Sequence, residues 1–357
     1  MIHVVYFNQW FSSITDVIAD LKEKHKDEIK IIASSRNKDH AYKDVVDKFI
    51  VEDWKETSNK EESMNNYIDW VLDLCNKYKV DYFFVKKHME EVAKHKIDFA
   101  LNGTFLVCDN YDTLLKLSKK SEVYDILKEN EVLRPYIPEY YCGNDRDTIL
   151  SLVDEASKCG ETPYCFKLDT DEGGASFRKI EQKPVDFESL KQFRVNSISR
   201  TETIEMLGGI KTDDLNKLLF MEVLDSPEVS VDCYKSKNGF IAICREKVAN
   251  SRVQKIYVNE EISRICEEIG RTFHFLFPYN VQFRMAHGKD KDNISNWRLL
   301  EINPRMSGGT YYTTLFDKNI ADACLCDIMN MTDSYDIEKY KHFDTLRVTH
   351  VEKAIKL

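Results

Sequence analysis

Three oxygen-bearing side chains in the last quarter of the sequence could hold a metal ion: Gln282, Glu301 and Asn303. They lie in, or directly after, two apolar, β-rich runs, 281–286 and 297–302, and the polar insert between the runs predicts a β-hairpin with a long loop. Residues two apart in a strand share a face, so Glu301 and Asn303 point the same way. Oxygen ligands of this kind suit Mg²⁺, which takes its remaining ligands from water and from substrate phosphates.

Two arginines accompany these oxygens. Arg284 shares a strand face with Gln282, and Arg305 follows Pro304, which cannot donate to a sheet and so ends the strand. The guanidinium fork binds phosphate through two parallel hydrogen bonds. The glycines of 307–309 form a turn that lets backbone approach a ligand closely. For this segment alone, a surface hairpin with a polar face and an Asn-Pro turn is the alternative.

The segment resembles the metal-binding end of the ATP-grasp superfamily, in the form found in carbamoyl-phosphate synthetase and biotin carboxylase. The resemblance rests on EINPR followed by SGG, with VQF one hairpin earlier. It implies that Gln282, Glu301 and Asn303 hold Mg²⁺, with Mn²⁺ as the alternative ion, against the phosphates of ATP. It also implies that Arg305 braces the transferring phosphoryl group, while Arg284 binds either phosphate or the carboxylate of a substrate.

Further basic residues match ATP-contacting positions of the family. The family has an ATP-contacting lysine in this helical stretch, at a set spacing before the chain leaves the helix, and that spacing assigns it to Lys120. The family usually has Asp before this lysine, whereas Lys119 stands here, so the assignment could shift by one residue. A solvated lysine on a helix face is the alternative. A basic residue after a later hairpin would lie near the phosphates, and Arg245 is the candidate with Lys247 in reserve.

A glycine-containing segment resembles the family's phosphate loop. Lys167 stands at a strand end, and the loop after it contains Gly173, Gly174 and Ser176. Glycines allow consecutive N–H groups to converge on phosphate oxygens. The loop departs from the family pattern in containing three acidic residues, Asp169, Asp171 and Glu172. These would repel phosphate unless they point away or meet a metal, and a plain β-turn is the alternative.

The strand 218–223 resembles the family's adenine and ribose wall. The resemblance places Glu222, Val223 and Leu224 at the adenine edge, where backbone groups read the base. Glu228 would face the ribose hydroxyls, since a carboxylate can accept two hydrogen bonds. Residues 225–227 replace the glycine-rich turn that is usual in the family.

The first 107 residues alternate strand and helix patterns, which predicts a parallel sheet with helices on both faces. The first strand is followed by NQWFSS and not by GxGxxG, which excludes a dinucleotide site there. Strands are expected within 2–7, 29–33, 49–51, 80–85 and 105–108, and helices within 14–21, 67–75 and 89–95. This part resembles the preATP-grasp domain of the family.

The fold class is therefore predicted as α/β, a parallel-sheet domain followed by an ATP-grasp domain whose two α+β subdomains clamp ATP. The expected parts are a preATP-grasp domain (1–108), an ATP-grasp domain (109–330) with its lid at about 140–220, and a closing segment (331–357). One helical stretch is expected over 109–130 with Asp112 as its N-cap, an amphipathic helix over 262–273, a helical segment over 311–331 and a strand within 344–357.

Composition limits the function classes. The chain has 357 residues, 43% hydrophobic and 31% charged, and its net charge of −10 without a basic block argues against a nucleic-acid surface. The ten cysteines show no CxxC spacing, and Cys324-Leu-Cys326 is too isolated a pair to predict a metal site. They indicate reduced thiols of a cytoplasmic protein, and no segment is long enough to cross a bilayer.

The resulting functional hypothesis is an ATP- and Mg²⁺-dependent ligase that joins a small carboxylate to an amine. Two alternatives share the same ATP half-site. One is a phosphotransferase that phosphorylates an alcohol. The other is a nucleotide-binding module without catalysis, suggested by the acidic glycine loop and by Gln282. The sequence indicates neither the acid nor the amine, and it leaves a homodimer open.

Overall fold

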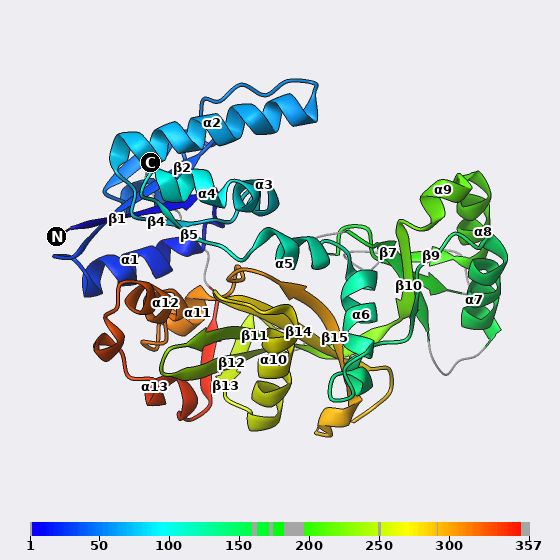
Figure 1. Ribbon diagram of the computed structural model, residues 1–357. Coiled ribbons are helices and arrows are strands. Elements are labelled where there is room, and N and C mark those ends of the chain that lie inside the picture. Colours follow the sequence, from blue (N-terminus) through cyan, green and yellow to red (C-terminus); the bar gives the residue numbers. More distant parts are fainter. Residues whose placement is uncertain are drawn as a thin grey trace. The chain divides into compact units, whose positions relative to one another are not determined.

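The computed structural model describes residues 2–158, 163–170, 174–181, 196–248, 251–290 and 292–350. The chain divides into two compact units (Figure 1). Unit 1 consists of Met1–Leu115, Ser230–Val281 and Ile302–Leu357, and unit 2 consists of Lys116–Val229 and Gln282–Glu301. The predicted parts 1–108, 109–330 and 331–357 stay predictions.

The N-terminal part of unit 1 is a five-stranded parallel sheet in the order β3-β2-β1-β4-β5, which confirms the predicted architecture (Figure 1). Its strands are β1 (His3–Asn8), β2 (Ile29–Ser35), β3 (Lys48–Val51), β4 (Tyr82–Phe84) and β5 (Phe105–Val107). The helices are α1 (Ile14–Lys24), α2 (Lys60–Tyr78), α3 (Met89–Lys94), α4 (Lys96–Leu101) and α5 (Tyr111–Lys116), and a short 3-10 helix, η1, covers Ala41–Asp44.

Strand β1 explains why its sequence is apolar without a break. Val5 and Phe7 belong to the core that contains the buried side of α1, whereas Tyr6 belongs to a second core that contains α2. Both faces of the strand are therefore covered, as expected for a parallel sheet. The hydroxyl of Tyr6 is satisfied inside the protein by Ser34 Oγ at 2.6 Å.

The prediction of one helix over 109–130 is wrong, because the segment forms two helices, α5 and α6 (Lys120–Lys128). Asp112 is not an N-cap, since α5 begins at Tyr111 and Asp112 lies in its first turn. Lys119 is extended, and the N–H of Ser121 donates to the carboxylate of Asp169. This tertiary cap starts a new helix where the sequence pattern alone suggested continuation.

Unit 2 contains a second five-stranded sheet in the order β6-β10-β7-β8-β9. Its strands are β6 (Tyr140–Tyr141), β7 (Tyr164–Leu168), β8 (Arg178–Glu181), β9 (Ser197–Ser199) and β10 (Leu218–Glu222). Helices α7 (Arg146–Lys158), α8 (Arg200–Gly209) and α9 (Thr212–Leu215) accompany it, and η2 covers Arg134–Tyr136. The core is formed by side chains that include Ile149, Val153, Phe166, Leu207 and Phe220.

A six-stranded sheet has the order β15-β14-β11-β12-β13-β16. Its strands are β11 (Leu224–Ser236), β12 (Gly239–Lys247), β13 (Val253–Tyr257), β14 (Tyr279–Ala286), β15 (Trp297–Asn303) and β16 (Leu346–Thr349). The adjacency of β14 and β15 confirms the predicted hairpin. Residues 225–227, which stand where the family usually has a glycine-rich turn, belong to β11.

Of the remaining helices, α10 follows the sequence pattern, whereas the helical segment predicted over 311–331 is divided into two shorter helices. Helix α10 (Glu260–Phe273) begins after Asn259, whose side chain accepts a hydrogen bond from the N–H of Ile262, and it buries one apolar side as predicted. Helices α11 (Tyr311–Thr314), α12 (Ile320–Ile328) and α13 (Glu338–Lys341), with the 3-10 turns η4 (Ile294–Asn296) and η5 (Thr332–Ser334), complete the described chain. Strand β16 confirms part of the predicted final strand, whose last residues, 351–357, lie outside the described ranges.

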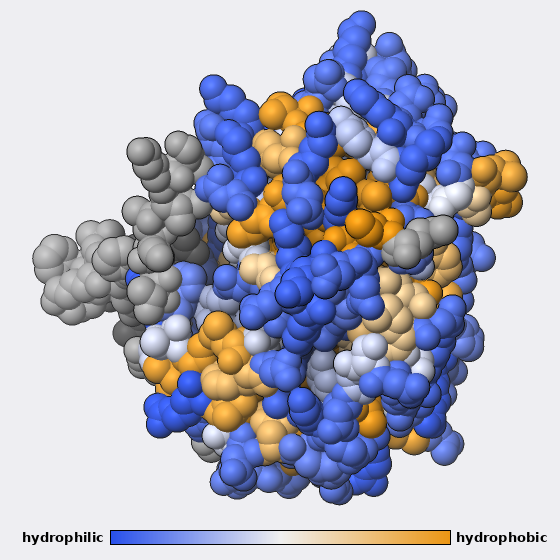
Figure 2. Space-filling model, turned by 90° about the vertical axis from the view of Figure 1, so that its left-hand side faces the viewer, coloured by the Kyte–Doolittle hydropathy of each residue, from blue (hydrophilic) through white to orange (hydrophobic). Residues whose placement is uncertain are grey.

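Figure 2 shows one face of the molecule, on which hydrophilic residues predominate and apolar residues gather in separate patches. In the part of the chain that the structure describes, no helix combines the length and apolar character that a membrane span requires. The nine described cysteines are free thiols, and all of them except Cys142 are buried.

Candidate functional site

The predicted magnesium ligands lie on β14 and β15, which are neighbours in the six-stranded sheet. Along β14, Gln282 and Arg284 are half-buried, while the residues between and beside them are buried. Glu301 in β15 is also half-buried, and Asn303 follows it on the same face of the strand. The structure thus brings Gln282 and Glu301 onto adjacent strands with partial access to solvent. Their role as metal ligands stays a prediction.

Arg284 carries a polar atom whose surroundings point to an anionic ligand. Its Nη2 donates to Ser226 Oγ at 3.3 Å, but its buried Nε has no hydrogen-bond partner among the described residues. An unsatisfied buried donor costs about 1–3 kcal/mol and more on a charged group, so native proteins rarely leave one. A phosphate or carboxylate beside Gln282 would satisfy this guanidinium, which fits the binding of magnesium and a nucleotide.

Tyr124 fixes the strand that carries Glu301, a contact that the sequence did not indicate. Its hydroxyl donates to the carbonyl oxygen of Leu300 at 2.9 Å, which ties α6 to β15. Burial, and then the negative charge of Glu301, raise the pKa of Tyr124 far above its usual range, so this phenol remains a neutral donor. Helix α6 therefore holds the backbone one residue before the predicted metal ligand.

The start of α6 is joined to the end of β7. Asp169 is buried, and its carboxylate accepts hydrogen bonds from the N–H of Ser121 at 2.8 Å and from its hydroxyl at 2.5 Å. Its carbonyl accepts from the N–H of Lys120 at 3.2 Å. Asp169 therefore caps α6, and both oxygens of its carboxylate accept hydrogen bonds from Ser121. Asp171 and Glu172 lie outside the described residues.

The two lysines at this helix start differ in their surroundings. Lys119 is exposed and its Nζ lies 2.6 Å from the carboxylate of Glu122, an ion pair that raises the pKa of Lys119. Lys120 is half-buried, and its backbone is bonded to the strand end beyond Lys167. These positions favour Lys120 over Lys119 as the nucleotide contact, which stays a prediction.

The glycine loop is described only in part. Gly173 lies outside the described residues, whereas Gly174 has a φ of 70°, a conformation that glycine adopts without strain. The hydroxyl of Ser176 accepts a hydrogen bond from the N–H of Leu168 at 2.8 Å, which closes the loop onto the end of β7. Lys167 is buried one residue before this closure.

Local hydrogen bonds hold the predicted adenine edge. The N–H of Glu222 donates to Glu139 O at 3.0 Å, and the N–H of Val223 donates to Pro163 O at 2.7 Å. The carboxylate of Glu222 accepts from the N–H of Glu139 at 3.0 Å, and burial raises the pKa of Glu222. Because the N–H groups of Glu222 and Val223 already donate within the protein, a bound base would form hydrogen bonds with the carbonyl oxygens of this segment and with Leu224.

The start of β11 is fixed by Asp225. Its carboxylate lies 3.0 Å from Nδ1 of His287 and accepts from the N–H of Gly288 at 2.9 Å. Burial raises the pKa of Asp225, but these hydrogen bonds outweigh burial and hold the pKa below its usual value. Glu228 is half-buried further along the same strand, and its contact with ribose stays a prediction.

Arg245 forms the centre of a buried polar network that sequence reasoning missed. Its guanidinium binds both carboxylate oxygens of Asp232, at 2.7 and 3.1 Å, and donates to Ser230 Oγ at 2.9 Å and Ser307 Oγ at 2.5 Å. Asn280 donates to the same carboxylate at 2.9 Å. Arg245 is thus committed to Asp232, and its predicted phosphate contact stays a prediction. The acidic partner thirteen residues earlier was the only available sequence signal.

This network supports the turn after β15. Thr310 Oγ1 donates to the Asp232 carboxylate at 3.2 Å, and Ser13 Oγ donates to Gly308 O at 2.7 Å. A Cβ atom on Gly309 would lie 2.8 Å from Cζ of Arg245, so the guanidinium occupies the space that a side chain would need. Glycine is required here for close approach.

Arg305 is held against the loop after β1. Its guanidinium carbon lies 5.0 Å from the ring centre of Phe11, and Lys86 Nζ lies 4.4 Å from the same ring. Cation–π contacts of this kind orient the positive charges without neutralising them. The sequence indicated neither Phe11 nor Lys86 as part of this neighbourhood.

Comparison with known proteins supplies a family context for this geometry. Residues 214–354 match the family described as ATP-grasp in the biosynthetic pathway with Ter operon. No match was found among curated protein sequences.

Solved structures resemble nearly the whole chain. The biotin carboxylase domain dimer of Hydrogenobacter thermophilus 2-oxoglutarate carboxylase, in complex with MgADP, ADP and bicarbonate, has a TM-score of 0.66 at 12% identity, covering 96% of this chain and 73% of that one. A biotin carboxylase–β,γ-ATP complex from Campylobacter jejuni has a TM-score of 0.61 at 13% identity, covering 95% and 73%. N5-carboxyaminoimidazole synthetase from Staphylococcus aureus, complexed with ADP, has a TM-score of 0.58 at 12% identity, covering 97% and 80%. At these identities the likeness establishes the fold.

Proposed function

We propose that this chain is an ATP- and Mg²⁺-dependent ligase of the ATP-grasp type that joins a small carboxylate to an amine. The match of residues 214–354 to an ATP-grasp family and the likeness of the fold to biotin carboxylase structures support this proposal. The observation that carries the proposal is the polar face of β14 and β15. Gln282 and Glu301 offer oxygen ligands on adjacent strands, and Arg284 beside them has a buried donor without a described partner. The nucleotide-bound relatives with the same fold support this assignment.

In the proposed reaction, a carboxylate oxygen of the substrate attacks the γ-phosphorus of ATP, the bond to the β,γ-bridging oxygen breaks, and ADP leaves. The nitrogen of an amine then attacks the carbonyl carbon of the acyl phosphate, phosphate leaves with the electron pair, and the nitrogen loses a proton. Positioning and charge neutralisation dominate such steps, so no nucleophilic side chain is required. Mg²⁺, when bound with ATP, neutralises charge on the phosphates.

The chain's own residues divide the remaining tasks. Gln282, Glu301 and Asn303 would hold the ion, and Lys120 and Lys167 would bind phosphates together with the loop that contains Gly174. Arg284 would orient an anionic group through its Nε, and Arg305, kept in place by Phe11, would meet charge that develops during phosphoryl transfer. Arg245 would act as a positioning residue, because its guanidinium supports the turn that follows Arg305.

Capture of the acyl phosphate tests the reaction class. The full-length protein is incubated with Mg²⁺, ATP and a panel of small acids, including amino acids, with hydroxylamine as the only amine. The proposal predicts a hydroxamate with at least one acid. Glu301→Gln should lower its rate of formation at least about 100-fold because a neutral amide oxygen replaces the charged carboxylate at the metal. Glu205→Gln, an exposed carboxylate on α8, is the matched control and should leave the rate unchanged.

Two other outcomes would replace the proposal. Phosphorylation of an alcohol without any hydroxamate would assign the protein to the phosphotransferases. Tight nucleotide binding with neither product, across the whole panel, would identify a nucleotide-binding module without catalysis.

A further inference from the structure

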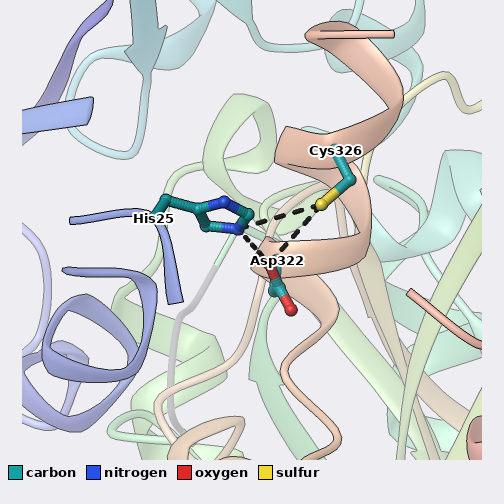
Figure 3. A group of neighbouring side chains, drawn as sticks. All are labelled: His25, Asp322 and Cys326. Atoms are coloured by element: carbon teal, nitrogen blue, oxygen red, sulfur yellow. Dashed lines mark hydrogen bonds and ion pairs between the residues drawn. The ribbon is translucent and has the colours of Figure 1, made fainter. Parts of the chain in front are cut away.

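We propose that His25, Asp322 and Cys326 form a second metal site, for an ion of the zinc class, which none of the predicted ATP-binding residues shares. All three side chains are buried, and their ligand atoms converge on one point (Figure 3). His25 comes from the end of α1, while Asp322 and Cys326 come from α12. The sequence did not indicate this site, because His25 and Asp322 are 297 residues apart and Cys326 suggested only an isolated cysteine pair.

Two of the three distances between the ligand atoms match those expected in a metal coordination shell. Cys326 Sγ lies 3.8 Å from His25 Nε2 and 3.6 Å from Asp322 Oδ1. A tetrahedral zinc ion bound to sulfur and to nitrogen or oxygen separates these ligands by about 3.5 Å. His25 Nε2 and Asp322 Oδ1 are 2.6 Å apart, a hydrogen bond, so the ion would replace one shared proton and widen this edge to about 3.3 Å.

The local structure positions the ligands without strain. Asp322 and Cys326 are four residues apart in α12, so they lie one turn apart on the same side of the helix. Helix α12 is anchored at its start by Asn319, whose side chain accepts from the N–H of Ala321 at 3.0 Å. His25 is the C-cap residue of α1 and ends that helix with its ring directed at α12 (Figure 3). The end of α1 and the helix α12 therefore fix the positions of the three ligand atoms.

Both polar ligands also have the outer partners that metal ligands require. The second ring nitrogen of His25, Nδ1, lies 2.9 Å from a carboxylate oxygen of Glu28. Such a carboxylate orients the imidazole and leaves Nε2 for the ion. The second oxygen of Asp322, Oδ2, lies 3.2 Å from Lys24 Nζ, which leaves Oδ1 for the ion. An ordinary buried ion pair explains the contact of His25 with Asp322. The thiol of Cys326 adds a third ligand atom that is directed at the same two side chains.

The fourth coordination position has space available. His25, Asp322, Glu28 and Lys24 line a cavity of about 340 Å³, whose lining also includes Asp336 and Tyr340. Water, or the carboxylate of Asp336 after a small movement, could complete the shell. One sulfur, one nitrogen and one oxygen ligand favour Zn²⁺ or Co²⁺ over Mg²⁺ or Ca²⁺, which prefer oxygen alone. The ion thus differs in class from the one proposed at Glu301.

Cobalt substitution tests the site directly. The full-length protein, purified without metal, is titrated with Co²⁺ while absorption is recorded. One equivalent should bind and produce a thiolate-to-cobalt charge-transfer band together with the visible bands of a four-coordinate ion. One equivalent of Zn²⁺ should abolish both. X-ray absorption of the zinc-loaded protein should show one sulfur among nitrogen and oxygen ligands, a result that needs no variant.

Matched variants on the same helix assign the ligands. Cys326→Ala should abolish the charge-transfer band, whereas Cys324→Ala, two residues earlier and also buried, should preserve it. Glu28→Gln should weaken Zn²⁺ binding by about 10–100-fold through loss of the outer partner of His25. Affinity for MgATP should stay unchanged in Cys326→Ala. Absence of the thiolate band in the wild-type protein, or a band that survives Cys326→Ala, would overturn the proposal and leave a hydrogen-bonded triad only.

Discussion

The contact between Gly309 and Arg245 yields the sharpest structural prediction. Replacing Gly309 with alanine puts a methyl group 2.8 Å from Cζ of Arg245, closer than nonbonded carbon atoms approach, so the guanidinium must move. It cannot move freely, because it is bonded to both oxygens of Asp232 and to Ser307 Oγ. The neighbouring Gly308 provides a matched control, since its added methyl group would meet only Phe11 and Ser13 at 3.7–3.9 Å.

The expected loss of stability follows from the bonds that must break. Each hydrogen bond to a charged group contributes about 1.5–3 kcal/mol, so losing one or two of them costs roughly 3 kcal/mol. Complete separation of the buried pair sets an upper limit of about 5 kcal/mol. At about 2–4 °C per kcal/mol for domains of 150–250 residues, Gly309→Ala should lower the melting temperature by roughly 6 °C or more. Gly308→Ala should change it by about 2 °C or less, because its contacts are ordinary ones.

The assay is thermal unfolding of both variants, followed by circular dichroism at one protein concentration. A double variant, Gly309→Ala with Arg245→Ala, identifies the cause, since the clash disappears once the guanidinium is absent. The alanine at 309 should then add little to the cost of Arg245→Ala. Equal melting temperatures for Gly309→Ala and Gly308→Ala would refute the reasoning.

Three further predictions concern other parts of the chain. Lys120→Met should weaken nucleotide binding at least tenfold, as measured by isothermal titration calorimetry. Lys119→Met removes an exposed lysine that is paired with Glu122 and should change the affinity less than twofold. Equal effects of the two variants would count against Lys120 as the nucleotide contact. Amide exchange at 174–176 should slow when a non-hydrolysable ATP analogue and Mg²⁺ bind, and unchanged exchange with nucleotide bound would mean that this loop is only a turn. Burial raises the pKa of Asp109 to about 7, although hydrogen bonds from Leu276 and Phe277 oppose this shift. The folded protein therefore keeps this carboxyl protonated where the unfolded chain loses the proton, and the free energy of unfolding falls as the pH rises from about 4 to 7. Asp109→Asn should therefore raise the melting temperature at pH 8 by an amount equivalent to roughly 2–4 kcal/mol and have little effect at pH 4, and an equal shift at both pH values would contradict the assignment.

The sequence predicted the fold because local patterns and tertiary structure agree over most of the chain. The unbroken apolar run of β1 indicates a strand covered on both faces, and Tyr6 and Phe7 do lie in different cores. The apolar periodicity of 262–273 likewise predicted α10. The pattern failed at 117–119, because the cap that begins α6 comes from Asp169, which follows β7. Local propensity contains no information about such a cap.

The candidate site was predictable where its chemistry is concentrated in one segment. The alternation that places Gln282 with Arg284, and Glu301 with Asn303, follows from strand periodicity, and the structure has both strands. The supports of these residues were not predictable. Asp232, for example, meets Arg245 only because β11 and β12 pair, so the buried ion pair is a consequence of the fold. The cluster at His25 shows the same limit over a longer range.

Transfer of the γ-phosphoryl group of ATP to a carboxylate, as proposed for this chain, can be detected by positional isotope exchange. ATP labelled with ¹⁸O at the β,γ-bridge is incubated with the protein, Mg²⁺ and the acid that gives a hydroxamate, in the absence of any amine or alcohol acceptor. We expect the label to move into the β-nonbridging positions only when both acid and Mg²⁺ are present. Glu301→Gln should abolish this movement, and Glu205→Gln should not. Label that stays at the bridge with acid, Mg²⁺ and nucleotide all bound would contradict the claim.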